Sequence, residues 1–384
     1  MKKINSILAI ILFVMAGCGG GNKQLIDDII TVDVTKNYSP KKELILQDFM
    51  DVEYIPLETT DEYVNQGFVQ DIGKDIILVK NYNRDGDIFV YDRNGKALRK
   101  INRRGGSGEE YINILNITLD EDNGEIFVTD FKKIVVYDLY GKFKRSFQHK
   151  ENGGSEFYTD IFNYDNDHLI CYKRYSKDIP FVLISKQDGS ITEIKIPFKE
   201  KKILQQNSSN TTVSPGPHRT IIPFKGNWML LEHSSDTVYT FLPDYSLRPF
   251  IVRTPSIQSM DPGVFLMLSF FSDRYYFMET VKNVYDWNTR EGFPSTYFMY
   301  DRQEKAFFGY TVYNGDYSTP KEFHISVTRS VNHEIESWYP LQSYQLVESY
   351  RNGELKGKLK DIAAKLDEDS NPVIMLIKHK KPNN

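Results

Sequence analysis

Two arginines followed by glycines form the segment of this 384-residue chain with the clearest potential for ligand chemistry. Arg103 and Arg104 precede Gly105-Gly106-Ser107-Gly108. Glycines expose backbone N–H groups and arginines bind oxyanions, so the segment could cradle an anion. It lacks the Gly-Lys-Ser/Thr that opens the helix of a P-loop. A partial copy at Gly153-Gly154 favours a connection between strands instead. We therefore keep Arg103 and Arg104 only as candidate ligand-binding residues.

One stretch has the side-chain spacing of a calcium loop. Asn81–Gly86 places oxygen-bearing side chains at every second position, and Asp92 stands at the twelfth position in place of the usual bidentate Glu. The missing Glu and the lack of flanking helices favour a β-turn before Ile88. No metal site is therefore predicted.

Residues for acid–base, nucleophilic or metal-assisted catalysis are not grouped along the chain. No pair of histidines has the i, i+4 spacing of a zinc protease, and no Gly-x-Ser-x-Gly elbow occurs. Carboxylates from distant segments can still meet in space, so the lack of a motif does not exclude catalysis. Catalytic residues stay unknown at this stage, and no cofactor is expected. The seven histidines are at positions 149, 168, 218, 233, 324, 333 and 379.

The N-terminus holds a cysteine that is placed for modification. Lys2-Lys3 precedes the mostly apolar run Ile4–Met15, which is the layout of a signal peptide and is shorter than the ~18 residues of a spanning helix. Met15-Ala16-Gly17-Cys18 resembles the lipobox of bacterial lipoproteins, with Met in place of the usual Leu. The resemblance implies that residues 1–17 are removed and that Cys18 carries lipid, which attaches the chain to a membrane. A general secretory signal with an incidental cysteine is the alternative.

Residues 18–43 are expected to form the lipidated cysteine and a tether. Asp does not follow Cys18, which by resemblance to sorting rules favours the outer membrane over the inner one. Surface-exported lipoproteins of Bacteroidetes usually carry acids just after the cysteine, whereas the first acid here is Asp27. The expected location is the outer membrane, facing the periplasm, with the cell surface as the alternative.

Composition points to an all-β body and excludes nucleic acid as a partner. The chain has 25 Tyr and 24 Phe, which suit half-buried pleated surfaces. Its net charge is −4, and no basic block is long enough to follow a phosphate backbone. Cys171 is the only cysteine besides Cys18, so we expect a buried, inert thiol and no intramolecular disulfide.

A repeat of 46 to 48 residues indicates tandem four-stranded units. Each copy reads as a strand, a tight turn and a second strand. Asp can hydrogen-bond the backbone of such a turn, and Asn-Gly can adopt positive φ in a two-residue hairpin. The segment Gly105–Tyr111 recurs in part as Gly153–Phe157, in step with the hairpins. The hairpin copies begin with Ile88–Lys96, Ile134–Lys142 and Phe181–Ser190, and degenerate copies follow at Thr237–Asp244 and Thr296–Arg302.

The predicted fold is a six-bladed β-propeller over residues 44–380. Five units follow from the hairpin copies, and the C-terminal segment must supply a sixth. Val52–Leu57 and Val373–Ile377 are both strand-like, and their pairing would close the ring and remove exposed edges. Glu200–Arg219 reads as an extended loop between blades, and Glu354–Leu366 reads as a helix that packs on the last blade.

These motifs together resemble the six-bladed β-propeller lipoproteins of Bacteroidetes, which are related in shape to NHL-repeat and TolB-type propellers. The family has no agreed activity, and the resemblance implies at most a glycan or peptide partner in nutrient uptake. The chain departs from the usual Gly-x-Gly-Pro-Gly-Glu-Tyr by having Ser107 where Pro would fall, followed by an additional Glu. The resemblance rests on Tyr54–Thr59, Val90–Lys96, Gly105–Tyr111, Asp236–Tyr239 and Asp367–Val373.

The leading functional hypothesis is a noncatalytic binding or scaffold module that docks a ligand on its loop-rich face. The rival is a carbohydrate-active enzyme, a hydrolase or lyase, with acids at the propeller funnel. A third possibility is an accessory subunit with an envelope protein partner. An enzyme should bring two acids or a metal cluster into the funnel, whereas a docking module should expose an aromatic patch there. Most aromatic residues, including Trp228, Trp287, Trp338 and Tyr275–Phe277, are expected to pack between blades rather than contact ligand.

Overall fold

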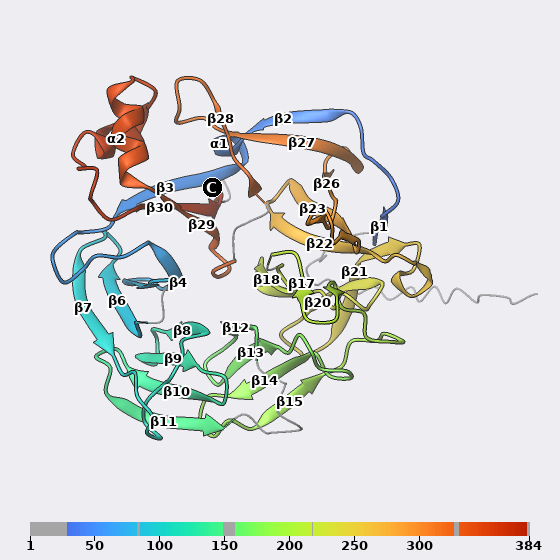
Figure 1. The fold of residues 1–384 in the computed structure, drawn as a ribbon, viewed down its shortest axis with the longest axis horizontal. Helices are drawn as coiled ribbons and strands as arrows, with labels where there is room; N and C mark the ends of the chain where they lie inside the picture. The colour runs from blue at the N-terminus through green and yellow to red at the C-terminus, as the bar shows by residue number, and fades with distance from the viewer. Residues whose placement is uncertain (1–28, 83–84, 149–157, 217, 326–329, 382–384) are drawn as a thin grey trace, which may run out of the picture.

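The computed structural model is a ring of six β-sheets around a central axis (Figure 1). The structure describes residues 29–82, 85–148, 158–216, 218–325 and 330–381. The predicted all-β class and the six-bladed propeller are confirmed. No helix in these ranges is long and apolar enough to cross a membrane.

The first three blades are regular four-stranded antiparallel sheets whose strands follow one another in chain order. Both faces of each sheet pack against neighbouring blades. Nearly every residue of the second and third strands is therefore buried. The first blade contains β4 (Phe68–Ile72), β5 (Ile76–Lys80), β6 (Asp87–Asp92) and β7 (Ala97–Asn102); the second contains β8 (Asn116–Asp120), β9 (Glu125–Thr129), β10 (Lys133–Asp138) and β11 (Phe143–Gln148); the third contains β12 (Asp160–Asn163), β13 (His168–Tyr172), β14 (Phe181–Ser185) and β15 (Ile191–Ile194).

The fourth and fifth blades each gain an outer strand from the N-terminal segment. β1 (Ile30–Asp33) pairs in parallel with the last strand of the fourth blade, and β2 (Lys41–Ile45) does the same in the fifth. These additions cover two sheet edges that would otherwise be open. The fourth blade contains β18 (Ile221–Phe224), β19 (Asn227–Leu230), β20 (Thr237–Phe241) and β21 (Leu247–Thr254); the fifth contains β22 (Val264–Phe271), β23 (Tyr275–Lys282), β26 (Ser295–Asp301) and β27 (Ala306–Asn314).

The sixth blade joins the two ends of the propeller. β29 (Ile335–Leu341) pairs with β30 (Val373–His379), and β30 pairs antiparallel with the N-terminal strand β3 (Met50–Pro56). Tyr54 lies opposite Met375 in that register. The predicted closure of the ring by terminal strands is confirmed.

The repeated hairpins use a different turn from the predicted two-residue one. Gly95 has φ +84°, but Asn94 is not among the residues with positive φ. The Gly95 N–H donates to the Asp92 carbonyl at 3.0 Å and the Asp92 N–H donates to the Lys96 carbonyl at 2.9 Å. The register of the β6–β7 pair shifts between Val90 and Tyr91. This is a type I turn followed by a glycine bulge, so a single left-handed residue suffices.

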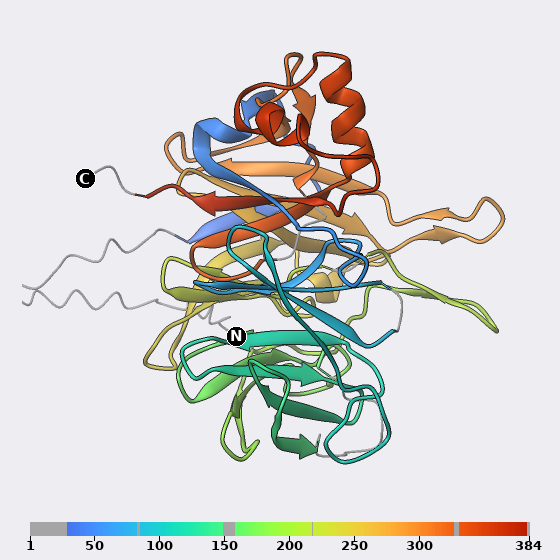
Figure 2. The same cartoon turned by 90° about the vertical axis from the view of Figure 1, so that its left-hand side faces the viewer.

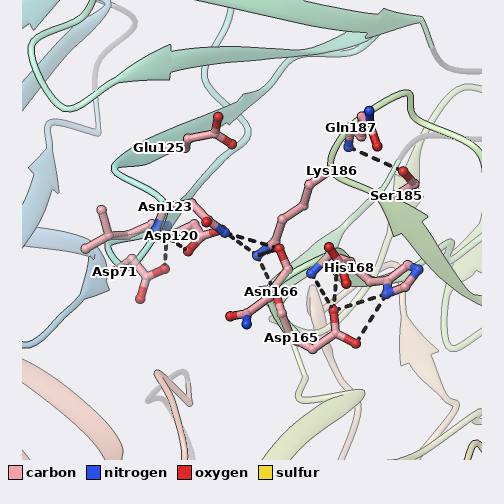
Figure 3. A network of polar contacts seen from close by, with 12 residues as sticks. Asp71, Asp120, Asn123, Glu125, Asp165, Asn166, His168, Ser185, Lys186 and Gln187 are labelled. Carbon is pink, nitrogen blue, oxygen red and sulfur yellow. Dashed lines mark hydrogen bonds and ion pairs between the residues drawn. The ribbon is translucent and has the colours of Figure 1, made fainter.

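Buried polar contacts tie the first three blades together near the axis (Figure 3). The Leu119 N–H donates to Asp71 Oδ2 at 2.7 Å, which joins the first blade to the second. Lys186 donates to Asp120 Oδ2 and to the Asp165 carbonyl, both at 2.5 Å, which joins the second blade to the third. Lys186 is 3 % exposed, so the interaction of its ammonium with Asp120 is shielded from solvent.

A second buried ion pair ties the last three blades together. Arg219, just before β18, contacts Glu336 of β29 and donates to Ser330 Oγ at 3.0 Å. Glu336 Oε1 also accepts from the Phe271 N–H of the fifth blade at 3.2 Å. One carboxylate therefore links three blades.

The C-terminal helical region differs from the predicted single helix over 354–366. Two helices form, α2 (Ser343–Arg351) and α3 (Gly357–Ala363), since Gly353 and Gly357 adopt positive φ and interrupt the helical path. Leu359 packs with Met375 of the last blade, which confirms the predicted packing. A short helix, α1 (Leu46–Phe49), precedes β3.

Two hairpins project from one side of the ring (Figure 2). The predicted loop over 200–219 contains β16 (Gln206–Asn207) and β17 (Thr212–Val213), and the fifth blade contains β24 (Tyr285–Asp286) and β25 (Glu291–Gly292). β30 ends at His379 on the opposite side, as Figure 2 shows. The two sides of the ring are therefore built differently.

Predicted packing residues are mostly in the core. Trp228, Trp338 and Tyr275–Phe277 are buried, whereas Trp287 is 39 % exposed on the β24–β25 hairpin. Cys171 is fully buried and free, and burial raises the pKa of its thiol. The expected inert thiol is thus placed where oxidants and metals have poor access.

Candidate functional site

The connections between second and third strands, and those from one blade to the next, share one face of the ring with the projecting hairpins (Figure 2). We call it the loop face. Many of the exposed large apolar side chains lie in these connections or next to them, spread over several blades. They are Val64, Tyr82, Ile112, Phe131, Tyr175, Trp287, Tyr297, Tyr339 and Tyr344.

Two adjoining cavities of about 400 and 410 Å³ lie on this face, over the fifth and sixth blades. Both are lined by Tyr297, Glu322, Phe323 and His324, so we treat them as one aromatic groove. Each cavity has the size of a small-molecule site. Tyr317, Tyr339, Gln342 and Gln345 line the first cavity further, and Tyr38, Tyr310 and Thr311 line the second.

The groove is built from segments that interrupt the regular blades. Tyr297 stands near the start of β26, and Tyr339 near the end of β29. Phe323 and His324 follow β28 (Lys321–Glu322), which pairs with β27 of the fifth blade. Tyr297 and Tyr339 remain 47 % and 39 % exposed, so both rings are accessible to a ligand.

Glu279 of β23 lies beneath the groove, opposite Tyr297 in the sheet. It is 6 % exposed. Burial raises the pKa of Glu279 to about 7, against the opposing effect of a hydrogen bond from Tyr297. The carboxyl group therefore changes charge close to neutral pH.

A smaller cavity of about 100 Å³ lies between the third and fourth blades. We call it the basic pocket, because Arg174, Lys201, Lys202, His218 and His233 line it. Other lining residues include Thr159, Asp160, Tyr172 and Thr220.

The charges around the basic pocket are only partly neutralised. Lys201 Nζ lies 2.8 Å from Glu232 Oε2, and Tyr172 also donates to that oxygen at 3.3 Å. Arg174 stacks on Tyr175 at 5.7 Å and has no carboxylate partner within the described part of the chain. Its guanidinium therefore remains available for an anion.

The two histidines of the pocket are neutral at pH 7. Burial lowers the pKa of His218 to about 4, helped by the positive charge of Arg174. Burial also holds the pKa of His233 well below its usual value. The two rings meet edge to face at 6.1 Å. His218 Nε2 and His233 Nε2 are both buried without a hydrogen-bond partner among the described atoms.

The basic pocket and the aromatic groove are neighbours through Glu279. His218 Nδ1 lies 3.7 Å from Glu279 Oε1, and Glu279 stands opposite Tyr297 of the groove in the sheet. No described residue lines both cavities, so Glu279 and His218 separate the groove from the pocket.

The predicted anion cradle is filled by the chain itself. The Glu110 carboxylate accepts from the Ser107 N–H at 2.9 Å, and this bond lowers the pKa of Glu110. A Cβ at Gly105 would meet the Glu110 carboxylate, so a side chain at this position would displace the carboxylate from the glycine segment. The glycine segment thus binds its own acid, as a connection between the first and second blades.

Arg103 and Arg104 lie on that connection and line neither the groove nor the basic pocket. Arg103 Nε donates to the Gly141 carbonyl at 2.8 Å, and the Arg104 backbone bridges to Tyr111. Their ligand-binding role stays a prediction.

The stretch with calcium-like spacing forms local turns. Asn81 donates to Asp85 Oδ2 at 2.9 Å, and Asp92 accepts from the hairpin backbone. Within the described ranges no three metal-ligating side chains come together. Asn83, His149, Gly153-Gly154 and the predicted signal peptide with Cys18 lie outside the described residues.

Sequence reasoning missed Arg174, His218, Glu279 and Tyr297 as a group. They come from three blades and meet only when the ring closes, so no local spacing connects them. The one available signal was their position in or next to connections, where propellers place their sites.

The comparisons with known proteins agree on a family without an assigned activity. The family profile "Domain of unknown function (DUF4934)" matches residues 29–378. This chain belongs to the DUF4934 family. A search of curated proteins finds no match.

Solved structures similar to this DUF4934 chain are remote from it in sequence. One is named "Putative exported protein" from Bacteroides fragilis; it is 15 % identical, has a TM-score of 0.57, and the match covers 92 % of this chain and 100 % of that one. It supports the fold alone. A virginiamycin B lyase from Staphylococcus aureus is 10 % identical at a TM-score of 0.40, with 86 % and 100 % covered. A likeness of that size carries no functional information.

Proposed function

We propose that this DUF4934 protein is a noncatalytic binding module of the cell envelope whose aromatic groove holds a glycan. The observation that carries the proposal is the groove itself, in which partly exposed tyrosines stand beside the amides of Gln342 and Gln345. Aromatic faces stack on the apolar faces of sugar rings, and amides and tyrosine hydroxyls bind their hydroxyl groups.

The rival enzymatic function has weaker support. Hydrolysis of a glycosidic bond by the usual mechanism needs two carboxyl groups that face the same bond. Glu322 is the acid that lines the groove, while Glu279 lies buried beneath it, opposite Tyr297 in the sheet. Incubation with an oligosaccharide that binds should therefore release no new reducing ends.

Glycan-array binding followed by calorimetry tests the proposal. Tyr297→Ala should weaken the best glycan by about 3- to 10-fold, as expected for one stacking contact. Tyr140→Ala removes a more accessible tyrosine from the opposite face and should leave affinity unchanged. Binding of peptides but no glycans, or equal effects of both variants, would contradict the proposal.

We also propose that Cys18 anchors the chain by lipid to the outer membrane. The lipobox-like sequence supports this, and so does the resemblance to an exported protein. The chain enters β1 and leaves β30 on the side opposite the hairpins of the loop face (Figure 2), so an anchored ring would turn its groove away from the bilayer. Labelling with an alkyne fatty acid should mark the chain in cells, and Cys18→Ser should remove the label and release the protein; label retained in that variant would refute the anchor.

A further inference from the structure

The basic pocket contains donors that no described side chain satisfies. Arg174 lacks a carboxylate partner, and His218 Nε2 and His233 Nε2 are buried without hydrogen-bond partners. In the tautomer with the proton on Nε2, each ring can donate one hydrogen bond. Three donors around one void are the requirement for binding the oxygens of an anionic group.

The size and charge of the pocket indicate which kind of anion it can bind. The void of about 100 Å³ accommodates a carboxylate group but not a whole sugar ring. Lys201 pairs with Glu232 at 2.8 Å, and Lys202 pairs with Glu200 at 3.7 Å. Asp160 also lines the pocket, and its Oδ2 accepts from Thr220 Oγ1 at 3.0 Å. Among the described residues, Arg174 is the lining cation without a carboxylate partner within ion-pair distance. A singly charged, planar carboxylate therefore fits better than a doubly charged phosphate.

The neighbouring groove indicates what carries the carboxylate. Glu279 lies 3.7 Å from His218 of the pocket and opposite Tyr297 of the groove in the sheet. The groove and the pocket share no described lining residue, so a glycan that occupies both would have one sugar stacked at Tyr297 and a neighbouring acidic sugar with its carboxylate in the pocket.

We infer that the basic pocket binds the carboxylate of a uronic acid residue, so that the protein recognises acidic glycans. The inference rests on the proposed function, because the groove must hold the rest of the glycan. It assigns Arg174 as the ion-pair partner of the carboxylate, and His218 and His233 as hydrogen-bond donors to its oxygens.

Calorimetry at pH 6 with matched monosaccharides tests the pocket by itself. D-galacturonic acid and D-galactose differ only in the carboxylate at C6, and galacturonic acid should bind at least ~10-fold more tightly, as a charge-assisted bond predicts. Arg174→Gln should abolish that difference. Arg248→Gln changes an exposed arginine on β21 of the fourth blade and should preserve the difference. Equal binding of the two sugars by the unchanged protein would overturn the inference.

A second arm separates this inference from the proposed function. Trigalacturonic acid should lose affinity in both Tyr297→Ala and Arg174→Gln. Loss in Tyr297→Ala alone would refute the pocket and leave the groove standing. Loss in Arg174→Gln alone would refute the groove. An acetylated peptide that binds through its free C-terminal carboxylate in an Arg174-dependent way, when galacturonic acid does not bind, would overturn the assignment of an acidic sugar.

Discussion

The two halves of the ring differ in how regular their blades are. The regular arc, residues 68–194, consists of three four-stranded blades with short hairpins and shared polar contacts. The elaborated arc, residues 221–379 with β1 to β3, carries the added strands, the α2–α3 region, the β24–β25 hairpin and the aromatic groove. The comparison indicates that regular sheets fix the frame, while insertions supply the site.

The regular arc is not featureless on its loop face. It has a cavity of about 230 Å³ between the first and second blades, next to the exposed Tyr82 and Phe131. That cavity is smaller than either part of the aromatic groove, and it provides an internal reference for the predictions below.

The largest expected effect comes from breaking the closing blade of the elaborated arc. Leu376 of β30 is fully buried between blades, so Leu376→Asp would bury an unpaired charge and should prevent folding. Leu376→Ala should lower the free energy of unfolding by about 2–5 kcal/mol, measured in urea. Leu169→Ala makes the same change in the regular arc and should cost about as much. A folded Leu376→Asp protein with an unchanged Tm would show that the closing blade is dispensable.

The buried ion pairs of the two arcs give the next effect. Arg219→Met leaves Glu336 buried without its cation, and Lys186→Met does the same to Asp120; each should cost about 3–5 kcal/mol in unfolding free energy. The double variant Arg219→Met/Glu336→Gln should recover part of the loss, since no buried charge remains unpaired. A cost below ~1 kcal/mol for either single variant would mean that solvent reaches that pair.

Substitutions in the two arcs should differ more in their effect on ligand affinity than in their effect on the free energy of unfolding. Tyr339→Ala removes a ring from the aromatic groove and should weaken an oligosaccharide about 3- to 10-fold in calorimetry. Tyr82→Ala removes a more exposed ring from the regular arc and should have no effect. The reverse result would place the site in the regular arc.

A pH effect of a few-fold should come from Glu279. Its pKa of about 7 means that the carboxyl group is charged at pH 8 and mostly neutral at pH 6. The charged form lies against His218 and repels a carboxylate ligand, so galacturonic acid should bind about 3- to 10-fold more tightly at pH 6.

The other charged groups around the pocket are Arg174, Lys201, Lys202, Asp160 and Glu232. Both histidines stay neutral over that range unless the ligand protonates them, because burial holds the pKa of His218 at about 4 and that of His233 well below its usual value. Glu279→Gln should therefore flatten the dependence of affinity on pH. A dependence that persists in this variant would point to ligand-induced protonation of the histidines instead.

The sequence predicted the frame well because its signals are local. Turn glycines such as Gly95 and Gly141, spaced 46 residues apart, mark the hairpins, and the apolar runs at Val52–Leu57 and Val373–Ile377 indicate the closing strands. The helical pattern around Leu359 was also visible, although two glycines with positive φ shortened the helix. These features depend on neighbours in the chain.

The candidate site could not be predicted in the same way. Arg174, His218 and Glu279 belong to separate blades, and only the closed ring brings them together. The conspicuous glycine segment after Arg104 turned out to bind Glu110 of its own connection. Local sequence motifs therefore mark strong backbone requirements, while ligand chemistry arises from contacts between distant segments.

Hydrogen–deuterium exchange with and without trigalacturonic acid tests the central claim most directly. The account predicts slower amide exchange in segments 172–175, 218–220, 295–298, 321–325 and 339–346, with no change at 81–82, 85–86, 112–115 and 130–132 in the regular arc. Protection confined to those four regular-arc segments, or no protection anywhere at a saturating concentration, would contradict the claim that the aromatic groove and the basic pocket form the binding site.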